Sequence, residues 1–269
     1  MNIPPLWKVR REIYRIIGKI KFAIMKLRTP QQTILYQGLE VSLTRSGMNP
    51  EIVLAMKSEA YEYPEIRGLK RALCSGDRVL ELGSGLGIIT ALAGRAVAPE
   101  GKVLSFEANL AMISDTKKFL ADHGISNVEL RHSVLVPKAK KDEKRDFHLT
   151  RSFASNSLLP SDKTVHEVIS VPAVQLNDIM AEFKPTVLVC DIEGGELELI
   201  PALDASGLRA VVMELHPDRL SVAQLAEIDA ALAAHGLIPN HSPALGGTVI
   251  LYERNTGKKR ATKWYQNGS

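Results

Sequence analysis

The sequence predicts an α/β fold in which a mostly parallel central sheet is covered by helices. Short apolar segments typical of buried strands alternate with longer segments of helical periodicity from residue 76 onward, the order that builds a parallel sheet. At residues 79–87, VLELGSGLG, one such strand runs directly into three glycines at alternating positions. A glycine-rich turn between a strand and a helix is a common binding place for nucleotide-like ligands.

The spacing of the glycines discriminates between ligand classes. Gly83, Gly85 and Gly87 lack Cβ atoms, so the chain can turn sharply and a ligand can approach its backbone. A dinucleotide fingerprint would need a third glycine at position 88, which is Ile88. The order acid-x-Gly-x-Gly-x-Gly, with Glu81 as the acid, resembles motif I of the class I S-adenosylmethionine-dependent methyltransferases, whose loop receives an amino-acid carboxylate and a ribose. A glycine-rich turn without a ligand is the alternative.

A second buried strand is expected at residues 102–106, after a helix at residues 88–98. It ends at Glu107, whose two carboxylate oxygens can accept hydrogen bonds from the vicinal hydroxyls of a ribose. Glu107 is therefore the leading candidate for a cofactor contact. The alternative is a solvated acid at the start of the next helix, residues 110–123.

The length and composition of the chain limit the classes of protein to which it can belong. With 269 residues, 45% of them hydrophobic, the chain can bury one large α/β core with additions. Cys74 and Cys190 have no paired spacing, which argues against a disulfide scaffold or a zinc site. No apolar run approaches the roughly 20 residues that span a bilayer, and the start lacks a signal-peptide pattern. An intracellular, cytoplasmic protein is expected.

The basic residues are concentrated at the two ends. Residues 1–28 carry a net charge of +7 and residues 254–269 a net charge of +5, which leaves −8 for the residues between them. An acidic body disfavours a nucleic-acid substrate, which needs a basic face around the active pocket. We expect four parts: a basic helix at 1–28, a helical lead-in at 29–75, the catalytic domain at 76–253 and a basic flexible tail at 254–269.

The segment 1–28 has the periodicity of an amphipathic helix. Its apolar residues recur at steps of three and four, and its basic residues fall elsewhere. Such a helix can lie on an anionic membrane surface, peripheral to the inner face of the membrane. The alternative is a helix packed on its own domain or on a second subunit of a homo-oligomer. In the lead-in, Asn49 and Pro50 can begin a helix, and another is expected at 65–74.

Between the second and third core helices the sequence predicts a third strand, 128–131, and an insertion. The mixed charge run 138–146 is typical of a solvated loop. Residues 147–150 and 168–171 can form a strand pair. Asn156 lies in the polar loop between them and is a candidate substrate contact.

Two further strand ends bring acids to the same edge of the sheet. The buried strand 187–190 is followed by Asp191 and Glu193, and the strand at 210–216 ends with Glu214 and His216. In an open α/β sheet, ligands bind at the carboxyl ends of the strands. A helix is expected immediately afterwards, at residues 196–203.

Taken together, these motifs resemble the FkbM family of methyltransferases over about residues 60–253. The resemblance rests on motif I, Glu107, the run VQLNDI at 174–179, the run DIEGGE at 191–196, and the run ELH at 214–216. It implies a class I methyltransferase fold with a seven-stranded sheet and a closing antiparallel hairpin, formed here by residues 236–239 and 248–252. It also implies S-adenosylmethionine as the methyl donor and a hydroxyl of a sugar, glycan or related natural product as the acceptor. The implied cofactor contacts are Glu81, Gly83, Ser84, Gly85, Gly87, Glu107, Ala108 and Ser133.

The sequence also departs from the family pattern. Many members have Asp-x-Gly-Ala-Asn at motif I, where this chain has ELGSG at residues 81–85. Members often carry Asn-Ala after the third strand, where this chain has His132 and Ser133.

The sulfonium donor needs little activation, so the enzyme must align an acceptor hydroxyl and help to remove its proton. Asp191 is the candidate for substrate positioning or general base, with Glu193 or His216 as alternatives. Glu214 is a candidate substrate contact. No metal is favoured, but Asp191, Glu193 and Glu214 offer an alternative set of oxygen ligands for magnesium.

Two other functions remain open from the sequence alone. An NAD-dependent oxidoreductase would share Glu107 and the first glycines, although the chain has no separate substrate domain. A non-catalytic scaffold on the membrane would keep the basic segment 1–28 and tolerate the loss of Asp191.

Overall fold

The structure, a computed structural model, describes residues 32–150, 165–217, 219–240 and 248–254. It divides into two compact units, Met1–Tyr63 and Pro64–Ser269. The predicted amphipathic segment 1–28, Asn156 and nearly all of the tail lie outside the described residues. Within the described residues, no helix has the length and apolar character needed to span a membrane.

The first unit begins with a hairpin of β1 (Thr33–Tyr36) and β2 (Leu39–Ser42), followed by α2 (Pro50–Lys57). The expectation of a purely helical lead-in is therefore wrong for its first part. The two turn residues, Gln37 and Gly38, both have positive φ angles, 49° and 71°, as the tight turn of a two-residue hairpin requires. The prediction for Asn49 is confirmed, because its side chain caps α2 by accepting from the Ile52 N–H at 2.9 Å.

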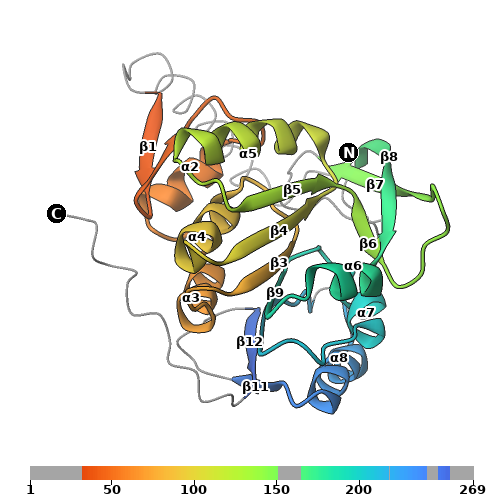
Figure 1. The fold of residues 1–269 in the computed structure, drawn as a ribbon. Coiled ribbons are helices and arrows are strands. Elements are labelled where there is room, and N and C mark those ends of the chain that lie inside the picture. The colour runs from red at the N-terminus through yellow and green to blue at the C-terminus, as the bar shows by residue number, and fades with distance from the viewer. Residues whose placement is uncertain (1–31, 151–164, 218, 241–247, 255–269) are drawn as a thin grey trace, which may run out of the picture. The chain divides into compact units, whose positions relative to one another are not determined.

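The second unit is built on a seven-stranded sheet with the order β11-β12-β10-β9-β3-β4-β5 (Figure 1). Its strands are β3 (Arg78–Leu82), β4 (Lys102–Glu107), β5 (Val128–His132), β9 (Val187–Cys190), β10 (Ala210–Glu214), β11 (Ile238–Asn240) and β12 (Val249–Glu253). The first five run parallel, whereas β12 is antiparallel to both β10 and β11. The predicted class I methyltransferase fold, with its closing antiparallel hairpin, is confirmed.

Helices cover both faces of this sheet (Figure 1). On one face lie α3 (Tyr63–Ala72), α4 (Ile88–Val97) and α5 (Leu110–Asp122); on the other lie α6 (Leu176–Phe183), α7 (Glu196–Leu199), the 3₁₀ turn η2 (Ile200–Ala202) and α8 (Val222–Ala234). The helix predicted at 196–203 is a single α-helical turn continued by η2. Pro201 contributes to this, because proline has no N–H and so cannot donate the hydrogen bond to the carbonyl oxygen four residues earlier that would continue the α-helix.

A large cluster of buried residues fills the space between the main sheet and helices α6 to α8. It joins apolar residues of β3, β4, β9 and β10 to residues of these helices, such as Leu176, Ile228 and Leu232. Every residue of β9 is buried, which explains why its sequence is apolar without alternation. This packing fixes the strand ends from which the candidate site is built.

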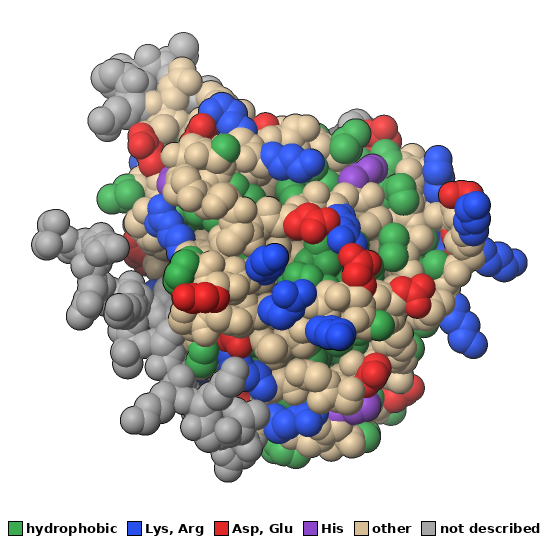
Figure 2. Space-filling model, in the orientation of Figure 1, with side chains coloured by type: hydrophobic (Ala, Val, Ile, Leu, Met, Phe, Trp, Pro, Cys, Tyr) green, Lys and Arg blue, Asp and Glu red, His purple; other side chains and the backbone are tan. Residues whose placement is uncertain are grey.

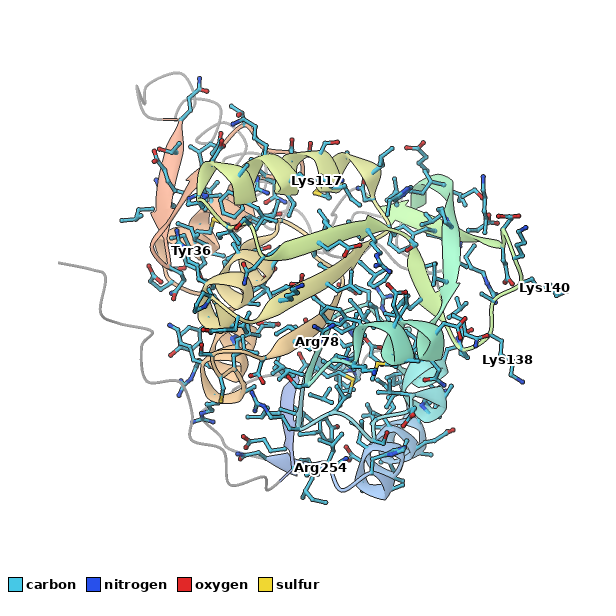
Figure 3. All side chains as sticks on the ribbon, viewed as in Figure 1. Tyr36, Arg78, Lys117, Lys138, Lys140 and Arg254 are labelled. Atoms are coloured by element: carbon cyan, nitrogen blue, oxygen red, sulfur yellow. The ribbon has the colours of Figure 1, made fainter. Side chains whose placement is uncertain are left out.

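A separate three-stranded sheet, β6-β8-β7, stands outside the main sheet. It consists of β6 (Val134–Val136), β7 (Lys144–Thr150) and β8 (Val165–Gln175), and β7 pairs antiparallel with β8. The predicted strand pair is confirmed and is longer than expected. The charge run 138–146 is a loop only in its first part, because residues 144–146 belong to β7. Lys138 and Lys140 extend from that loop away from the ribbon (Figure 3).

Candidate active site

The glycine loop between β3 and α4 needs glycine for both its conformation and its close packing. Gly83, Gly85 and Gly87 have φ angles of 88°, 49° and 74°, a region that residues with a Cβ rarely adopt. A Cβ at Gly83 would lie 2.2 Å from the Asp191 carbonyl oxygen, and a Cβ at Gly87 would lie 2.5 Å from Cγ2 of Thr116. The loop therefore packs closely against Asp191, which follows β9, and against Thr116 on α5.

Glu107, at the end of β4, faces this loop. Its Oε2 accepts hydrogen bonds from the Gly85 N–H at 2.9 Å and from the Ser84 hydroxyl at 3.2 Å, and its Oε1 accepts from the Asn109 N–H at 2.8 Å. Burial raises the pKa of Glu107, and these donors oppose the increase. These donors use most of the roughly four lone-pair sites of the carboxylate, so a ribose hydroxyl would take the place of one of them.

Glu81 lies beneath the loop, where only 1% of the residue is exposed. Its Oε2 accepts from the hydroxyl of Thr90 on α4 at 2.7 Å and from the hydroxyl of Ser105 on β4. Burial raises the pKa of Glu81 to about 7, although both hydroxyls oppose the increase. In this structure Glu81 ties α4 to β4 below the loop, and its predicted contact with a cofactor stays a prediction.

The remaining residues predicted to contact the cofactor lie at the ends of the neighbouring strands. Ala108 follows β4 and Ser133 follows β5, and both are buried. The His132 Nε2 and the Ala108 carbonyl oxygen are 2.9 Å apart, which joins the two strand ends. Ala108 and Ser133 therefore lie at the same edge of the sheet as Glu107.

The second group of predicted residues also comes together. Asp191 and Glu193 follow β9, and His216 follows β10. The His216 Nε2 lies 3.7 Å from Asp191 Oδ1 and 3.6 Å from Glu193 Oε2, and its Nδ1 lies 3.1 Å from Glu196 Oε1. We call Asp191, Glu193, Glu196 and His216 the acid–histidine cluster. The sequence predicts Glu196 only as the start of a helix, although the run DIEGGE at 191–196 places this third acid close to the first two.

Arg219 holds Glu193 in an uncommon conformation. Glu193 has a φ of 55°, in the left-handed region that residues other than glycine seldom occupy. The Arg219 Nη2 lies 3.0 Å from Glu193 Oε2, and its Nη1 donates to the Glu193 carbonyl oxygen. Arg219 lies in an irregular segment after β10 and is not among the residues predicted from the sequence.

Glu214 is outside the group of residues that could share a metal ion. Its Oε1 accepts from the Thr248 hydroxyl at 2.7 Å. Within the described residues, the ligand atoms that lie within 4.8 Å of one another belong to Asp191, Glu193 and His216. The alternative metal set predicted from the sequence is therefore corrected, with the imidazole of His216 in place of the Glu214 carboxylate.

The excess of acids in the cluster changes its proton affinities. Burial raises the pKa of Asp191, the negative charge of Glu214 raises it further, and His216 opposes this. Burial lowers the pKa of His216, but the hydrogen bond to Glu196 and the charges of the surrounding carboxylates outweigh it and raise the pKa to about 9. The imidazole is therefore a cation at neutral pH and partly balances the carboxylates.

The glycine loop and the acid–histidine cluster are joined through adjacent strands. The Asp191 N–H donates to the Leu82 carbonyl oxygen at 3.1 Å, and the Gly83 N–H donates to the Phe106 carbonyl oxygen at 3.0 Å. The ends of β4, β3 and β9 thus form one continuous edge. This is the edge at which open α/β sheets bind ligands.

Comparisons with solved structures find other proteins described as methyltransferases. A SAM-dependent methyltransferase from Aquifex aeolicus is 15% identical with a TM-score of 0.40, and the match covers 70% of this chain and 87% of that one. The Precorrin-6y C5,15-methyltransferase of Geobacter metallireducens is 15% identical with a TM-score of 0.42, and that match covers 72% and 88% of the two chains.

Comparison with curated proteins finds the catalytic subunit TRM61 of the tRNA (adenine(58)-N(1))-methyltransferase from Cryptococcus neoformans, 39% identical over 57 residues. That match covers 21% of this chain and only 13% of the relative's length. A family model described as the methyltransferase FkbM domain matches residues 87–238, which is more than half of the chain. The chain therefore belongs to the FkbM methyltransferase domain family.

Proposed function

We propose that this protein transfers a methyl group from S-adenosylmethionine to a hydroxyl oxygen of a sugar, a glycan or a related natural product. Membership of the FkbM domain family supports methyl transfer. The single observation that carries the choice of donor is the orientation of Glu107, whose carboxylate accepts from the Gly85 N–H at 2.9 Å and so faces the glycine loop. An acid in this position fits the two hydroxyls of a ribose.

The methionine and adenine parts of S-adenosylmethionine would lie along the same edge of the sheet. Gly87 is the N-cap residue of α4 and has no side chain to accept from the first-turn N–H groups. Those N–H groups and the helix dipole favour a carboxylate, such as that of the methionine part of the donor. Ala108 and Ser133 would then contact the adenine.

Asp191 is our candidate for the group that receives the acceptor proton. Its side chain is 40% exposed, compared with 19% for Glu193 and 10% for His216, so it is the most accessible member of the three. A lone pair of the acceptor oxygen forms the new bond to the methyl carbon while the C–S bond breaks and its electron pair returns to sulfur. The hydroxyl proton passes to the Asp191 carboxylate, and the products are a methyl ether and S-adenosylhomocysteine.

Charge supports a small-molecule or glycan acceptor over a nucleic acid. The chain between its basic ends has a net charge of −8. On the face drawn in Figure 2, acidic and basic side chains are interspersed, without a wide basic stripe. The chain also lacks the Asn/Asp-Pro-Pro-aromatic motif of enzymes that methylate amino groups. Glu214, beside the cluster, would contact the acceptor.

Calorimetry with S-adenosylhomocysteine tests the donor site. We expect one molecule to bind per chain, and Glu107→Ala to weaken binding at least tenfold because the ribose contact is lost. The matched control is Glu129→Ala, which removes an exposed acid from β5, the neighbouring strand. An absence of binding by the wild-type protein at high micromolar ligand would refute the proposal.

Transfer of a labelled methyl group tests the acceptor class. The full-length protein would be incubated with labelled S-adenosylmethionine and either a panel of glycans and hydroxylated natural products or total tRNA. We expect label in the first set, as an alkali-stable methyl ether. Label in the tRNA alone would overturn the acceptor class and leave the donor assignment intact.

A further inference from the structure

We infer that Asp191, Glu193 and His216 form a binding site for a divalent transition-metal ion, with Glu196 as the residue that orients the imidazole. The ligands would be one carboxylate oxygen from each acid and Nε2 of His216. The binding of the ion is independent of the proposed methyl transfer, whereas any role in holding an acceptor oxygen rests on that proposal.

The two distances from the imidazole to the carboxylates are close to the spacing between two ligands of one ion. Nε2 of His216 lies 3.7 Å from Asp191 Oδ1 and 3.6 Å from Glu193 Oε2, and the three ligand atoms lie within 4.8 Å of one another. Ligands about 2.0–2.2 Å from one ion, at tetrahedral or octahedral angles, are roughly 2.8–3.6 Å apart. A shift of a few tenths of an ångström would bring the imidazole to that spacing from both carboxylates.

The imidazole is held in the orientation that a metal ligand needs. About nine-tenths of the His216 side chain is buried, and its Nδ1 lies 3.1 Å from Oε1 of Glu196, a residue that is fully buried. This contact fixes the ring so that Nε2 is directed between Asp191 and Glu193. Metal-bound histidines commonly donate their other N–H to a carboxylate in this way, which sets the tautomer and the ring orientation.

The surroundings of the two carboxylates also fit an ion. Oδ1 of Asp191 is a buried oxygen without a hydrogen-bond partner, and a buried charge without a partner is costly. Arg219 contacts both the carbonyl oxygen and the carboxylate of Glu193, which holds this side chain in place beside His216. An ion bound between these side chains would satisfy the open oxygen of Asp191.

The chemistry of the ligands indicates the class of ion. Two carboxylates and one imidazole combine hard oxygens with a borderline nitrogen, a set that suits Mn²⁺ or Zn²⁺ better than Mg²⁺ or Ca²⁺, which prefer oxygen alone. The site lies next to Gly83, so a bound ion would be adjacent to the glycine loop. There it would act as a Lewis acid toward an acceptor hydroxyl.

The test is a titration of the full-length, chelator-treated protein with Mn²⁺, followed by electron paramagnetic resonance and carried out without S-adenosylmethionine. We expect the signal of free Mn²⁺ to be quenched up to one ion per chain. Glu193→Gln and His216→Gln should weaken binding at least tenfold, and Glu196→Gln should weaken it by about 10- to 100-fold through loss of the orienting contact. Glu227→Gln, which removes an exposed acid from α8, should bind like the wild type.

The metal site and the proposed methyl donor can fail separately in this experiment. Unquenched Mn²⁺ with wild-type protein, or equal quenching by the ligand variants, overturns the metal site. Binding of S-adenosylhomocysteine to each variant serves as the folding control, so loss of Mn²⁺ with retention of this ligand supports the site. If His216→Gln does not fold, the wild-type Mn²⁺ complex is studied by pulsed electron paramagnetic resonance. Modulation of the signal by a nitrogen nucleus would support His216 as a ligand, and its absence would overturn the imidazole ligand. Failure of the wild type to bind S-adenosylhomocysteine refutes the proposed donor without affecting the Mn²⁺ result.

Discussion

Gly83 and Asp191 are in backbone contact, so close that a single methyl group cannot be placed between them. A Cβ on Gly83 would lie 2.2 Å from the Asp191 carbonyl oxygen, and the Asp191 N–H donates to the carbonyl oxygen of Leu82, the residue before Gly83. The first residue of the glycine loop and the first residue of the acid–histidine cluster are thus held together without any side-chain contact. A change at one position is expected to displace the other.

Gly83→Ala is the direct test of this contact. The new Cβ must push the Asp191 backbone away, and the φ of 88° adds strain of about 1–2 kcal/mol for a residue with a Cβ. We expect a loss of at least 2 kcal/mol in the free energy of unfolding and a more than tenfold weaker affinity for S-adenosylhomocysteine, measured by denaturant unfolding and calorimetry.

Gly76→Ala is the matched control for that substitution. Gly76 has a φ of 82°, but a Cβ there would meet nothing within 4 Å. The free energy of unfolding of Gly76→Ala should therefore fall only by the backbone strain, about 1–2 kcal/mol. Its affinity for S-adenosylhomocysteine should be unchanged. Equal effects of the two substitutions on that affinity would contradict the importance of the contact with Asp191.

The buried carboxyl of Glu81 predicts a pH dependence of stability. Burial raises its pKa from 4.5 to about 7, so between these values the folded chain binds a proton that the unfolded chain has released. The stabilisation is complete below pH 4.5 and is lost as the pH rises through 7. It corresponds to about 3 kcal/mol at most for a shift of this size.

Comparison with Glu81→Gln isolates this effect. The glutamine keeps an oxygen that can accept from Thr90 and Ser105, but it does not titrate. Glu107 contributes with the same sign in both proteins and cancels in the comparison. We expect the free energy of unfolding to fall more steeply between pH 4.5 and 7 in the wild type than in the variant. Parallel profiles would show that Glu81 ionises normally in the folded protein.

A buried ion pair at the opposite end of β3 should be important for stability. The Arg209 guanidinium donates from Nε to Asp77 Oδ1 at 3.0 Å and from Nη2 to Oδ2, and Asp77 is 1% exposed. Arg209→Ala leaves a buried carboxylate without its counter-ion. We expect the free energy of unfolding to fall by roughly 3 kcal/mol, measured with urea.

An exposed pair in the same unit provides the contrast. Lys118 and Asp122 are 2.6 Å apart on α5, but their side chains are 76% and 55% exposed. Lys118→Ala should therefore cost less than about 0.5 kcal/mol. A similar loss for both variants would indicate that burial does not govern the strength of the Arg209 pair.

The basic segment 1–28 predicts attachment to anionic membranes. Attraction of roughly 1 kcal/mol for each basic residue near the lipid would add to apolar burial. Deletion of residues 1–28 should abolish co-sedimentation with vesicles that contain anionic lipids, while neutral vesicles should bind neither protein strongly. Unchanged partitioning of the truncated protein would point to packing of this segment on protein instead.

The sheet could be predicted because its signals are local. The strand at residues 78–82 is rich in apolar residues and is followed directly by three alternating glycines. The strand at 187–190 is apolar throughout and buried on both faces, so each strand could be recognised from the local sequence. The β1–β2 hairpin was missed because its turn, Gln37-Gly38, is not one of the strongest turn pairs. Its alternation of Tyr36, Leu39 and Val41 on the buried side was nevertheless present in the sequence.

The site could be predicted only in part, because its contacts join residues from different elements. Asp191, Glu193 and His216 were identified from their positions at strand ends. Glu196 and Arg219 were missed, since their roles depend on a chain path that brings β9 and β10 side by side. The sequence also did not distinguish Glu214 from His216 as a metal ligand, because β10 ends at Glu214 and the alternation of side chains no longer applies beyond it.

The small sheet of β6, β7 and β8 has a consequence for engineering. Its three strands pair only with one another in the described structure, and the seven strands of the main sheet pair without it. A chimera that exchanges residues 137–172 with those of another family member should therefore preserve the main framework. Activity of such a chimera toward different hydroxyl compounds would show whether this sheet influences the acceptor, while the glycine loop and Glu107 stay unchanged.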